Sequence, residues 1–120
     1  MDNVLKNWIK YVTKQDLEKV VDMYAEDGIL LGTFSDVVRK GKKDIEDYFK
    51  FFLKKNPSAE LVQIERHIIN DNNFTVCGFY DFEVDSEDDN RVISKARFSF
   101  VFQKQNDLFK ILSHHSSIMP

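Results

Sequence analysis

Polar side chains close the last apolar stretch of the chain. The apolar segment 108–112 runs almost directly into His114, His115, Ser116 and Ser117. Neutral imidazole can both donate and accept a proton near neutral pH, which suits it to general acid–base chemistry. A titratable tip on an apolar strand therefore marks the candidate functional site.

Other kinds of chemistry are not predicted. His114 and His115 are adjacent, so on a strand they face opposite ways, and no third ligand is spaced with either to form a metal site. An EF-hand loop starting at Asp85 would need glycine at Asn90 and glutamate at Ala96. No glycine-rich dinucleotide loop is present, so we expect neither a metal nor a cofactor.

The elements that position this tip are strands. Residues 92–102 alternate, with Val92, Ala96, Phe98, Phe100 and Phe102 on one side, which is typical of a strand with one face on a core. The turn residues 105–107 then lead into a second strand, so the two form an antiparallel hairpin. Preceding apolar segments at 61–69 and 74–84 predict two further strands, and residues 108–116 supply the fourth.

The first half of the chain predicts helices. Apolar spacing indicates helices over 4–11 and 17–24, with Asp27-Gly28 ending the second, and Thr13-x-x-Asp16 resembles a capping box at its start. A third helix opens at Gly41 and ends before Pro57, and residues 29–31 form a short buried strand. The order predicts one α+β domain over residues 1–120, with helices packed on one face of a mostly antiparallel sheet.

Composition limits the partners. The chain has 120 residues, a net charge of −3 and no continuous apolar segment long enough to span a membrane, so neither nucleic acid nor a membrane is an expected partner. No secretory signal is visible at the start, which predicts a cytoplasmic location. Eleven phenylalanines suggest a wide aromatic-lined interior. The one cysteine, Cys77, is expected to be a buried, inert thiol and excludes an internal disulfide.

Longer strings of residues resemble a known family. YAEDGILLGTFSDVVRKGKKDIEDYFKFFL, ARFSFVFQK and HHSSIMP are similar to the association (hub) domain of calcium/calmodulin-dependent kinase II, and more so to its free-standing bacterial SgcJ/EcaC-type relatives. The resemblance covers nearly the whole chain. It implies a nuclear transport factor 2-like cone, in which a curved sheet wraps around helices, with a conical pocket and assembly through the sheet. No kinase domain accompanies it, so no kinase activity is expected.

The resemblance also selects site residues. It places His115 and His67 where the hubs carry histidines on the last and the first long strand, and these could converge with Tyr80 as acid–base candidates. His114 is expected to be structural instead. Tyr80 and Phe100 stand where the hubs have pocket arginines, so carboxylate binding of the hub kind is not implied. The expected ligand-binding set is Tyr24, Phe49, Phe52, Tyr80, Phe82, Phe98, Phe100 and His115, with Trp8 as a further wall.

The opposite parity of the long strands predicts an outer face. It carries apolar side chains among charges of both signs, namely Cys77, Phe79, Asp81, Glu83, Ile93, Lys95, Arg97, Ser99 and Val101. Such a mixture suits a protein interface, so we expect a homo-oligomer, a dimer at least. Arg97 could serve this interface or anchor an anion in the pocket, with the interface favoured by its parity.

Two functions remain open at this point. The first is a stand-alone association-domain-like protein that oligomerises through its sheet and binds an unidentified small ligand. The alternative is a cone-fold enzyme, an isomerase, cyclase, dehydratase or SgcJ/EcaC-type oxidoreductase, that acts on a small hydrophobic substrate through histidine and tyrosine acid–base chemistry. A buried titratable group with a shifted pKa would favour the enzyme.

Overall fold

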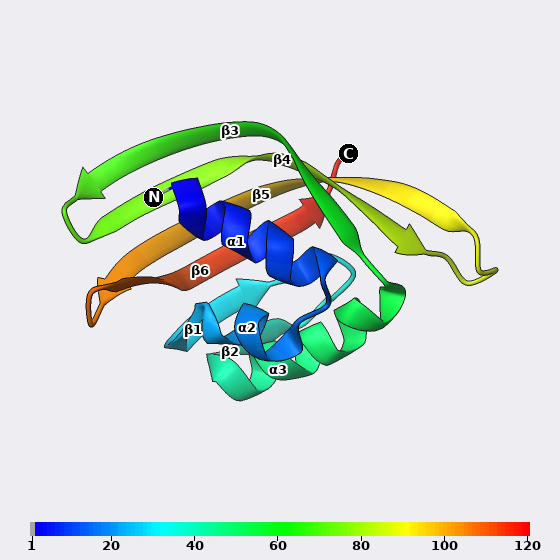
Figure 1. Cartoon of the computed structure of the whole chain (residues 1–120), viewed down its shortest axis with the longest axis horizontal. Helices are drawn as coiled ribbons and strands as arrows, with labels where there is room; N and C mark the ends of the chain where they lie inside the picture. The colour runs from blue at the N-terminus through cyan, green and yellow to red at the C-terminus, as the bar shows by residue number, and fades with distance from the viewer. Residues whose placement is uncertain (1) are drawn as a thin grey trace.

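A computed structural model, which describes residues 2–120, shows a strongly curved sheet with helices packed against its concave side (Figure 1). Six strands pair in the order β2-β1-β6-β5-β4-β3. Their bounds are β1 Tyr24–Leu31, β2 Val38–Lys40, β3 Ser58–Asn70, β4 Asn73–Asp85, β5 Arg91–Gln105 and β6 Leu108–Ile118. All neighbours are antiparallel except β1 and β6, which run parallel. The α+β class and the cone architecture are confirmed.

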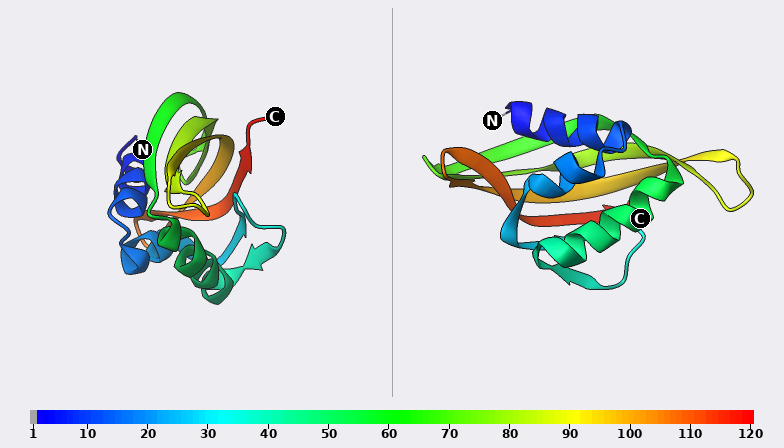
Figure 2. Two further views of the ribbon diagram at one scale, coloured as in Figure 1. Left: turned by 90° about the vertical axis from the view of Figure 1, so that its right-hand side faces the viewer. Right: turned by 60° about the horizontal axis from the view of Figure 1, so that its bottom comes forward.

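Three helices fill the concave side (Figure 2). They are α1 Asp2–Thr13, α2 Leu17–Asp22 and α3 Gly41–Phe52, and a single 3₁₀ turn, η1 Leu53–Lys55, follows α3. Helix α1 buries Leu5, Trp8 and Val12, which lie one above the other at helical spacing. The chain leaves η1 through Asn56 in the left-handed region, next to Pro57, as the sequence predicts for this helix end.

The second helix is shorter than predicted. It ends at Asp22, and Tyr24 begins strand β1 instead of completing the helical stripe. Pairing with β6, where Tyr24 lies opposite Ile111, outweighs the local helical pattern. The capping prediction was also wrong in detail, because Asp16 is itself the N-cap and accepts the Lys19 N–H at 3.2 Å.

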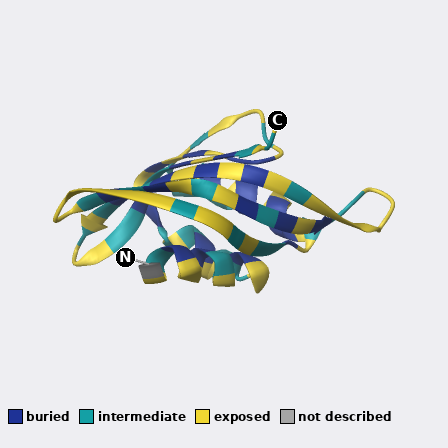
Figure 3. Cartoon of the chain, turned by 90° about the horizontal axis from the view of Figure 1, so that it is seen from above, coloured by how far each residue is buried: buried dark blue, intermediate teal, exposed yellow. Residues whose placement is uncertain are grey.

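Alternation along β4 and β5 separates two faces of the sheet (Figure 3). Even-numbered residues face the helices and form the core, whereas odd-numbered residues face away from it. The two strands pair without interruption from Asn73↔Gln103 to Asp85↔Arg91, so this parity is kept across both. The predicted inner and outer faces of the long strands are therefore present.

Strand β6 does not keep that parity. Phe102 lies opposite Ile111 but Val101 lies opposite Ser113, so Leu112 is an extra residue in a β-bulge. One inserted residue turns the rest of a strand over, because side chains alternate with a period of two. Beyond the bulge, His114 lies opposite Phe100 on the inner face and His115 lies opposite Ser99 on the outer face.

No helix among residues 2–120 is long and apolar enough to cross a membrane.

Candidate functional site

The interior of the cone is almost completely filled. A cavity of about 10 Å³ remains between the helices and the sheet, lined by Trp8, Leu30, Gly32, Tyr48, Phe49, Phe52, Tyr80, Phe82, His114 and Ser116. That volume holds about one water molecule. Aromatic rings occupy the rest: Phe100 stacks on His114 with centroids 3.8 Å apart, and Tyr80 stacks on Phe98 at 4.4 Å. The expectation of a wide interior is wrong for this structure.

A chain of buried hydrogen bonds runs through this aromatic core. The Trp8 indole N–H donates to the Tyr24 hydroxyl at 3.1 Å, and that hydroxyl lies 2.8 Å from His114 Nδ1. On the other side of the ring, Nε2 lies 3.2 Å from the Tyr80 hydroxyl. Each of these four side chains is at most 3% exposed, so every polar atom in the chain needs a partner within the protein.

The chain continues from Tyr80 toward the end of β6. The Tyr80 hydroxyl donates to Ser116 Oγ at 2.5 Å, and Ser116 Oγ is hydrogen-bonded to Thr33 Oγ1. Thr33 lies just beyond β1, so these bonds connect strand β4 to both β6 and the loop after β1. The Tyr48 hydroxyl fixes the same loop by donating to the Thr33 carbonyl at 2.7 Å.

Donor and acceptor chemistry assigns the hydrogens of this chain. Tyr80 gives its hydrogen to Ser116, so it can only accept from His114 Nε2. Neutral His114 then has a lone pair on Nδ1, which accepts the Tyr24 hydrogen. The reverse tautomer would leave the Tyr24 hydrogen without an acceptor in the core, at a cost of roughly 1–3 kcal/mol. His114 is therefore the Nε2–H tautomer, and all the bonds point from Trp8 toward Thr33.

Burial keeps the side chains in this series of hydrogen bonds uncharged. It lowers the pKa of His114 to about 3, and the neighbouring imidazole of His115 acts in the same direction. Burial also raises the pKa of the Tyr24 and Tyr80 hydroxyls well above the usual range, against the lowering effect of their hydrogen bonds to Trp8 and Ser116. At neutral pH these hydrogen-bonded side chains are therefore all neutral donors and acceptors.

A groove lies on the surface beside the end of this chain. It has a volume of about 360 Å³ and is enclosed by the loop after β1 and the end of β6, through Leu31, Gly32, Thr33, Phe34, Ser35, Asp36, Val37, Val38, His115, Ser116, Ser117 and Ile118. We call it the mouth groove. Gly32 and Ser116 line both this groove and the interior cavity. A Cβ on Gly32 would lie 2.4 Å from the Tyr48 ring, so only glycine allows that ring to close the interior here.

Most of the expected ligand-binding residues lie inside the cone. Phe49, Phe52, Tyr80 and Phe82 line the small cavity, as does Trp8. Three further residues are buried in the same core: Tyr24, Phe98 and Phe100. Tyr24 is hydrogen-bonded to His114, and the two phenylalanine rings contact each other. Their shared location follows the predicted parity, and ligand binding by them stays a prediction.

The histidines are placed differently from the prediction. His115 is exposed beyond the β6 bulge and lines the mouth groove instead of the interior, and His67 is exposed on β3 opposite Thr75. His67, Tyr80 and His115 therefore do not converge. The buried histidine is His114, which the sequence indicated as structural, and the bulge at Leu112 is the reason for the exchange.

The sequence reasoning also missed two hydroxyl groups. Thr33 and Ser116 are 2% and 5% exposed, although short polar residues in a loop and at a strand end are usually solvated. The burial of Ser116 could be predicted from that of His114 once the bulge is known, because residues two apart in β6 face the same side of the sheet. Thr33 has no comparable signal in its own segment.

The remaining candidates lie outside the interior. Arg97 is exposed and donates to Ser117 Oγ at 3.3 Å, which places it on the outer face and not in the pocket. Cys77 is an exposed free thiol on the same face, rather than a buried one. Among residues 2–120 no group of three or more potential ligands could hold a metal ion.

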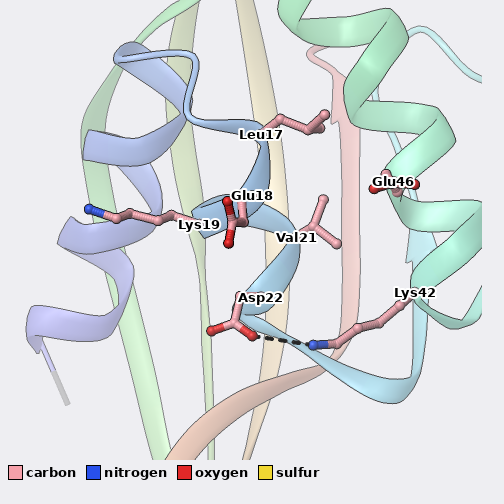
Figure 4. A pocket seen from close by; sticks show the side chains of 7 residues that line it. All are labelled: Leu17, Glu18, Lys19, Val21, Asp22, Lys42 and Glu46. Carbon is pink, nitrogen blue, oxygen red and sulfur yellow. Dashed lines mark ion pairs between the residues drawn. The ribbon is translucent and has the colours of Figure 1, made fainter.

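A further hollow, of about 600 Å³, lies between α2 and α3 (Figure 4). Its walls carry charges of both signs, including Lys42, whose Nζ lies 3.5 Å from Asp22 Oδ1. The Asp22 side chain is 73% exposed, so this ion pair is solvated and weak. The residues that line this open cleft do not include any of the buried hydrogen-bonded side chains described above.

A curved sheet wrapped around helices, with a mouth beside an aromatic interior, defines the class of cone-fold proteins. The chain belongs to the SnoaL-like domain family, whose model matches residues 1–120. The resemblance to the kinase association domain is confirmed by a solved structure from Xanthomonas campestris, assigned as a calcium/calmodulin-dependent protein kinase II association domain. It is 33% identical to this chain with a TM-score of 0.91, over 97% of this chain and 83% of that chain.

More distant structures share the fold. A ketosteroid isomerase-like protein from Erwinia carotovora atroseptica is 10% identical, with a TM-score of 0.82 over 100% of this chain and 94% of that chain. An NTF2-like protein of unknown function from Pseudomonas putida is 16% identical, with a TM-score of 0.82 over 97% of this chain and 82% of that chain. A comparison with curated proteins gave no match.

Proposed function

We propose that this protein is a stand-alone association-domain-like module, which assembles with copies of itself through the outer face of its sheet and binds a small ligand at the mouth of its cone. The observation that carries the assembly is the composition of that face. Phe79 is 37% and Ile93 is 65% exposed although both lie within long paired strands, and no helix of the described chain covers them. Exposed apolar groups rimmed by charges are typical of protein interfaces.

The charges on the outer face favour a two-fold contact. Lys95 and Arg97 lie on β5, and their direct neighbours Asp81 and Phe79 lie on β4, followed by Glu83. A positive strand beside a negative strand is self-complementary, because a two-fold rotation places β5 of one copy against β4 of the other. An ordinary specific contact of this kind buries roughly 800 Å² on each partner. The Xanthomonas campestris relative, assigned as an association domain, supports the same proposal.

The enzyme alternative has less support from the contacts. Both ring nitrogens of His114 are engaged by tyrosines, and its lone pair is already occupied by the Tyr24 hydrogen. A general base needs a free lone pair within reach of substrate. His67 and His115 lie on exposed positions. The buried histidine with its lowered pKa is thus explained by packing and hydrogen bonding.

Light scattering tests the assembly directly. The chain has a mass of 14.1 kDa, so the proposal requires a stable species of about 28 kDa or more at micromolar concentration. Arg97→Glu introduces like charge opposite Asp81 and Glu83 of the second copy and is expected to weaken association at least about tenfold. Lys6→Glu, the same charge change on an exposed position of α1, is the matched control and should leave the mass unchanged. A wild-type mass near that of one chain would refute the assembly.

A further inference from the structure

Another surface groove lies at the opposite end of strand β6 from the mouth groove. It has a volume of about 390 Å³ and lies between α1, the end of α2 and the hairpin of β5 and β6. We call it the hairpin groove. Five of its nine lining residues are apolar or aromatic, namely Val4, Tyr11, Met23, Leu108 and Phe109. Leu108 is 62% exposed, so the groove retains apolar surface that nothing in residues 2–120 covers.

Hydrogen bonds to the backbone hold the walls of the hairpin groove in place. The Ile111 N–H donates to the Met23 carbonyl at 2.8 Å, and Lys110 Nζ donates to the Asp22 carbonyl at 2.7 Å. Both bonds tie the junction of α2 and β1 to strand β6. On the other wall, the buried Trp8 side chain anchors α1 to the core. The groove is therefore preformed, which favours binding without a large rearrangement.

Lysine side chains stand on both flanks of the hairpin groove. On the helical flank, Lys10 Nζ lies 5.9 Å and Lys19 Nζ lies 5.6 Å from the centroid of the Tyr11 ring. On the hairpin flank, Lys104 Nζ lies 5.4 Å from the centroid of the Phe109 ring. Within residues 2–120 neither Lys10 nor Lys104 forms an ion pair with a carboxylate. The charge of these two lysines is therefore available to a partner.

The charge of the hairpin groove contrasts with that of the whole chain, whose net charge is −3. The cleft between α2 and α3 is lined by three acids and two lysines, whereas the hairpin groove is lined by two lysines and one acid. That acid is Asp22, which is already paired with Lys42 at 3.5 Å and with Lys110 at 3.6 Å. The groove thus carries a positive surplus that complements an acidic partner.

An apolar floor with a lysine on each flank favours a helical partner. In an amphipathic helix, residues at i, i+3, i+4 and i+7 form an apolar stripe, and the residues beside the stripe project sideways. Acidic residues at those positions can reach Lys10 on one flank and Lys104 on the other. In an extended segment, alternate side chains point to the opposite face, so its acids would point away from the groove.

We propose that the hairpin groove binds an acidic amphipathic helix of a partner protein, with the apolar stripe on the groove floor and carboxylates beside the flanking lysines. The competing occupants are a second copy of the chain and an anionic membrane. Helices α1 and α3 already bury their apolar faces in the core, so a second copy offers no such helix. A membrane surface is flat and would contact the rim of the groove and not its floor.

Two peptides of equal shape test this proposal. One consists of three Glu-Glu-Leu-Leu repeats with acetyl and amide ends, and the other has lysine in place of every glutamate. In nuclear magnetic resonance titrations of the full chain at low salt, the acidic peptide should shift amides of residues 7–11, 19–23 and 104–110. It should bind at least about tenfold more tightly than the basic peptide, and added sodium chloride should weaken it. Equal affinities, or shifts confined to other residues, would overturn the proposal.

Charge reversals test the flanking lysines. Lys10→Glu combined with Lys104→Glu should weaken binding of the acidic peptide at least about tenfold. Lys6→Glu combined with Lys54→Glu makes the same change of net charge at exposed positions that do not line the groove, and should alter the affinity less than about threefold. Equal losses in the two double variants would mean that net charge alone attracts the peptide, which would overturn the site.

A truncation tests the apolar floor. Leu108→Ala removes side-chain surface that is exposed in the free protein, so the fold should be retained and the acidic peptide should bind about fivefold more weakly. Leu31→Ala makes the same change at an exposed position of the mouth groove and should bind like the wild-type protein. An unchanged affinity in Leu108→Ala would contradict docking of an apolar stripe.

The competing occupants give different results. Groove amides that shift with protein concentration in the absence of peptide would assign the groove to a second copy and reject the helix. Sedimentation with phosphatidylglycerol vesicles that the Lys10 and Lys104 reversal abolishes, without peptide binding, would assign it to a membrane and reject the helix as well. Light scattering on the same samples reports the assembly through the outer face independently, so failure of one proposal leaves the other standing.

Discussion

The two faces of the sheet differ in how far their apolar residues are buried. On the inner face, Phe98, Phe100 and Phe102 are each at most 4% exposed and pack against one another, and Phe100 also packs against Trp8 of α1. On the outer face, Phe79 of β4 and Ile93 of β5 have more than a third of their surface exposed. The helices cover one side only, so the inner face is buried within one chain and the outer face is left exposed.

This difference explains why the interior has so little free space. Eleven phenylalanines could line a wide cavity, but aromatic rings packed at centroid distances of 4.4–5.5 Å fill the cone instead. The polar groups that remain inside are joined in one directional chain of hydrogen bonds. Exposed apolar groups lie instead at the mouth groove and on the outer face.

The largest expected effect is on the free energy of unfolding, which is compared for one phenylalanine-to-alanine substitution on each face. Phe100→Ala removes a fully buried ring and should lower the free energy of unfolding by about 3–5 kcal/mol. Phe79→Ala on the outer face should cost less than about 1 kcal/mol in the separated chain, because the ring is already 37% exposed. Urea unfolding at low protein concentration measures both. Similar losses for the two variants would remove the distinction between the faces.

The sequence predicts the inner face better than it predicts the site. Strict alternation in β4 and β5 assigns both faces correctly, because the two strands pair without a bulge. The bulge at Leu112 has no signature in the sequence, since Leu112 fits a regular strand as well as an irregular one. The resemblance suggested His115 for the pocket, whereas the strand beyond the bulge turns His114 to the inner face and His115 to the outer face. The end of α2 was misjudged because Tyr24 satisfies helical spacing as well as strand pairing with Ile111.

A pH dependence of stability sharpens the comparison between the two histidines. The pKa of His114 is lowered by burial to about 3 in the folded chain, against an ordinary value of 6.5. Between these values the unfolded state binds a proton that the folded state does not, so stability falls as the pH falls, by up to about 1.4 kcal/mol per pH unit. The loss begins below about pH 6.5 and levels off near pH 3. Above pH 6.5 this group contributes no pH dependence.

Two substitutions test whether His114 causes this fall of stability with falling pH. His114→Leu abolishes this part of the acid slope and also lowers stability at neutral pH, because the Tyr24 hydrogen loses its acceptor. His115→Leu makes the same substitution at the exposed neighbour and should keep most of the slope, because burial is the larger cause of the lowered His114 pKa. Unfolding free energies from urea titrations at pH 7, 6, 5 and 4 give the comparison. An unchanged slope in His114→Leu would mean that other groups titrate in this window.

The smallest expected effect concerns the boundary between the interior and the mouth groove. Tyr48→Phe removes the hydroxyl that donates to the Thr33 carbonyl at 2.7 Å and leaves the buried ring against Gly32. One net hydrogen bond corresponds to about 1 kcal/mol, so global stability should fall by about that amount. The local consequence is sharper, because this bond ties the loop after β1 to α3. Amide hydrogen exchange at residues 32–35 should accelerate several-fold, while exchange in β4 and β5 follows only the global change. Tyr11→Phe, which removes a hydroxyl from a partly exposed tyrosine of α1, should leave the loop unaffected. If both variants exchange alike at these amides, the loop is held by its packing and not by the Tyr48 hydroxyl.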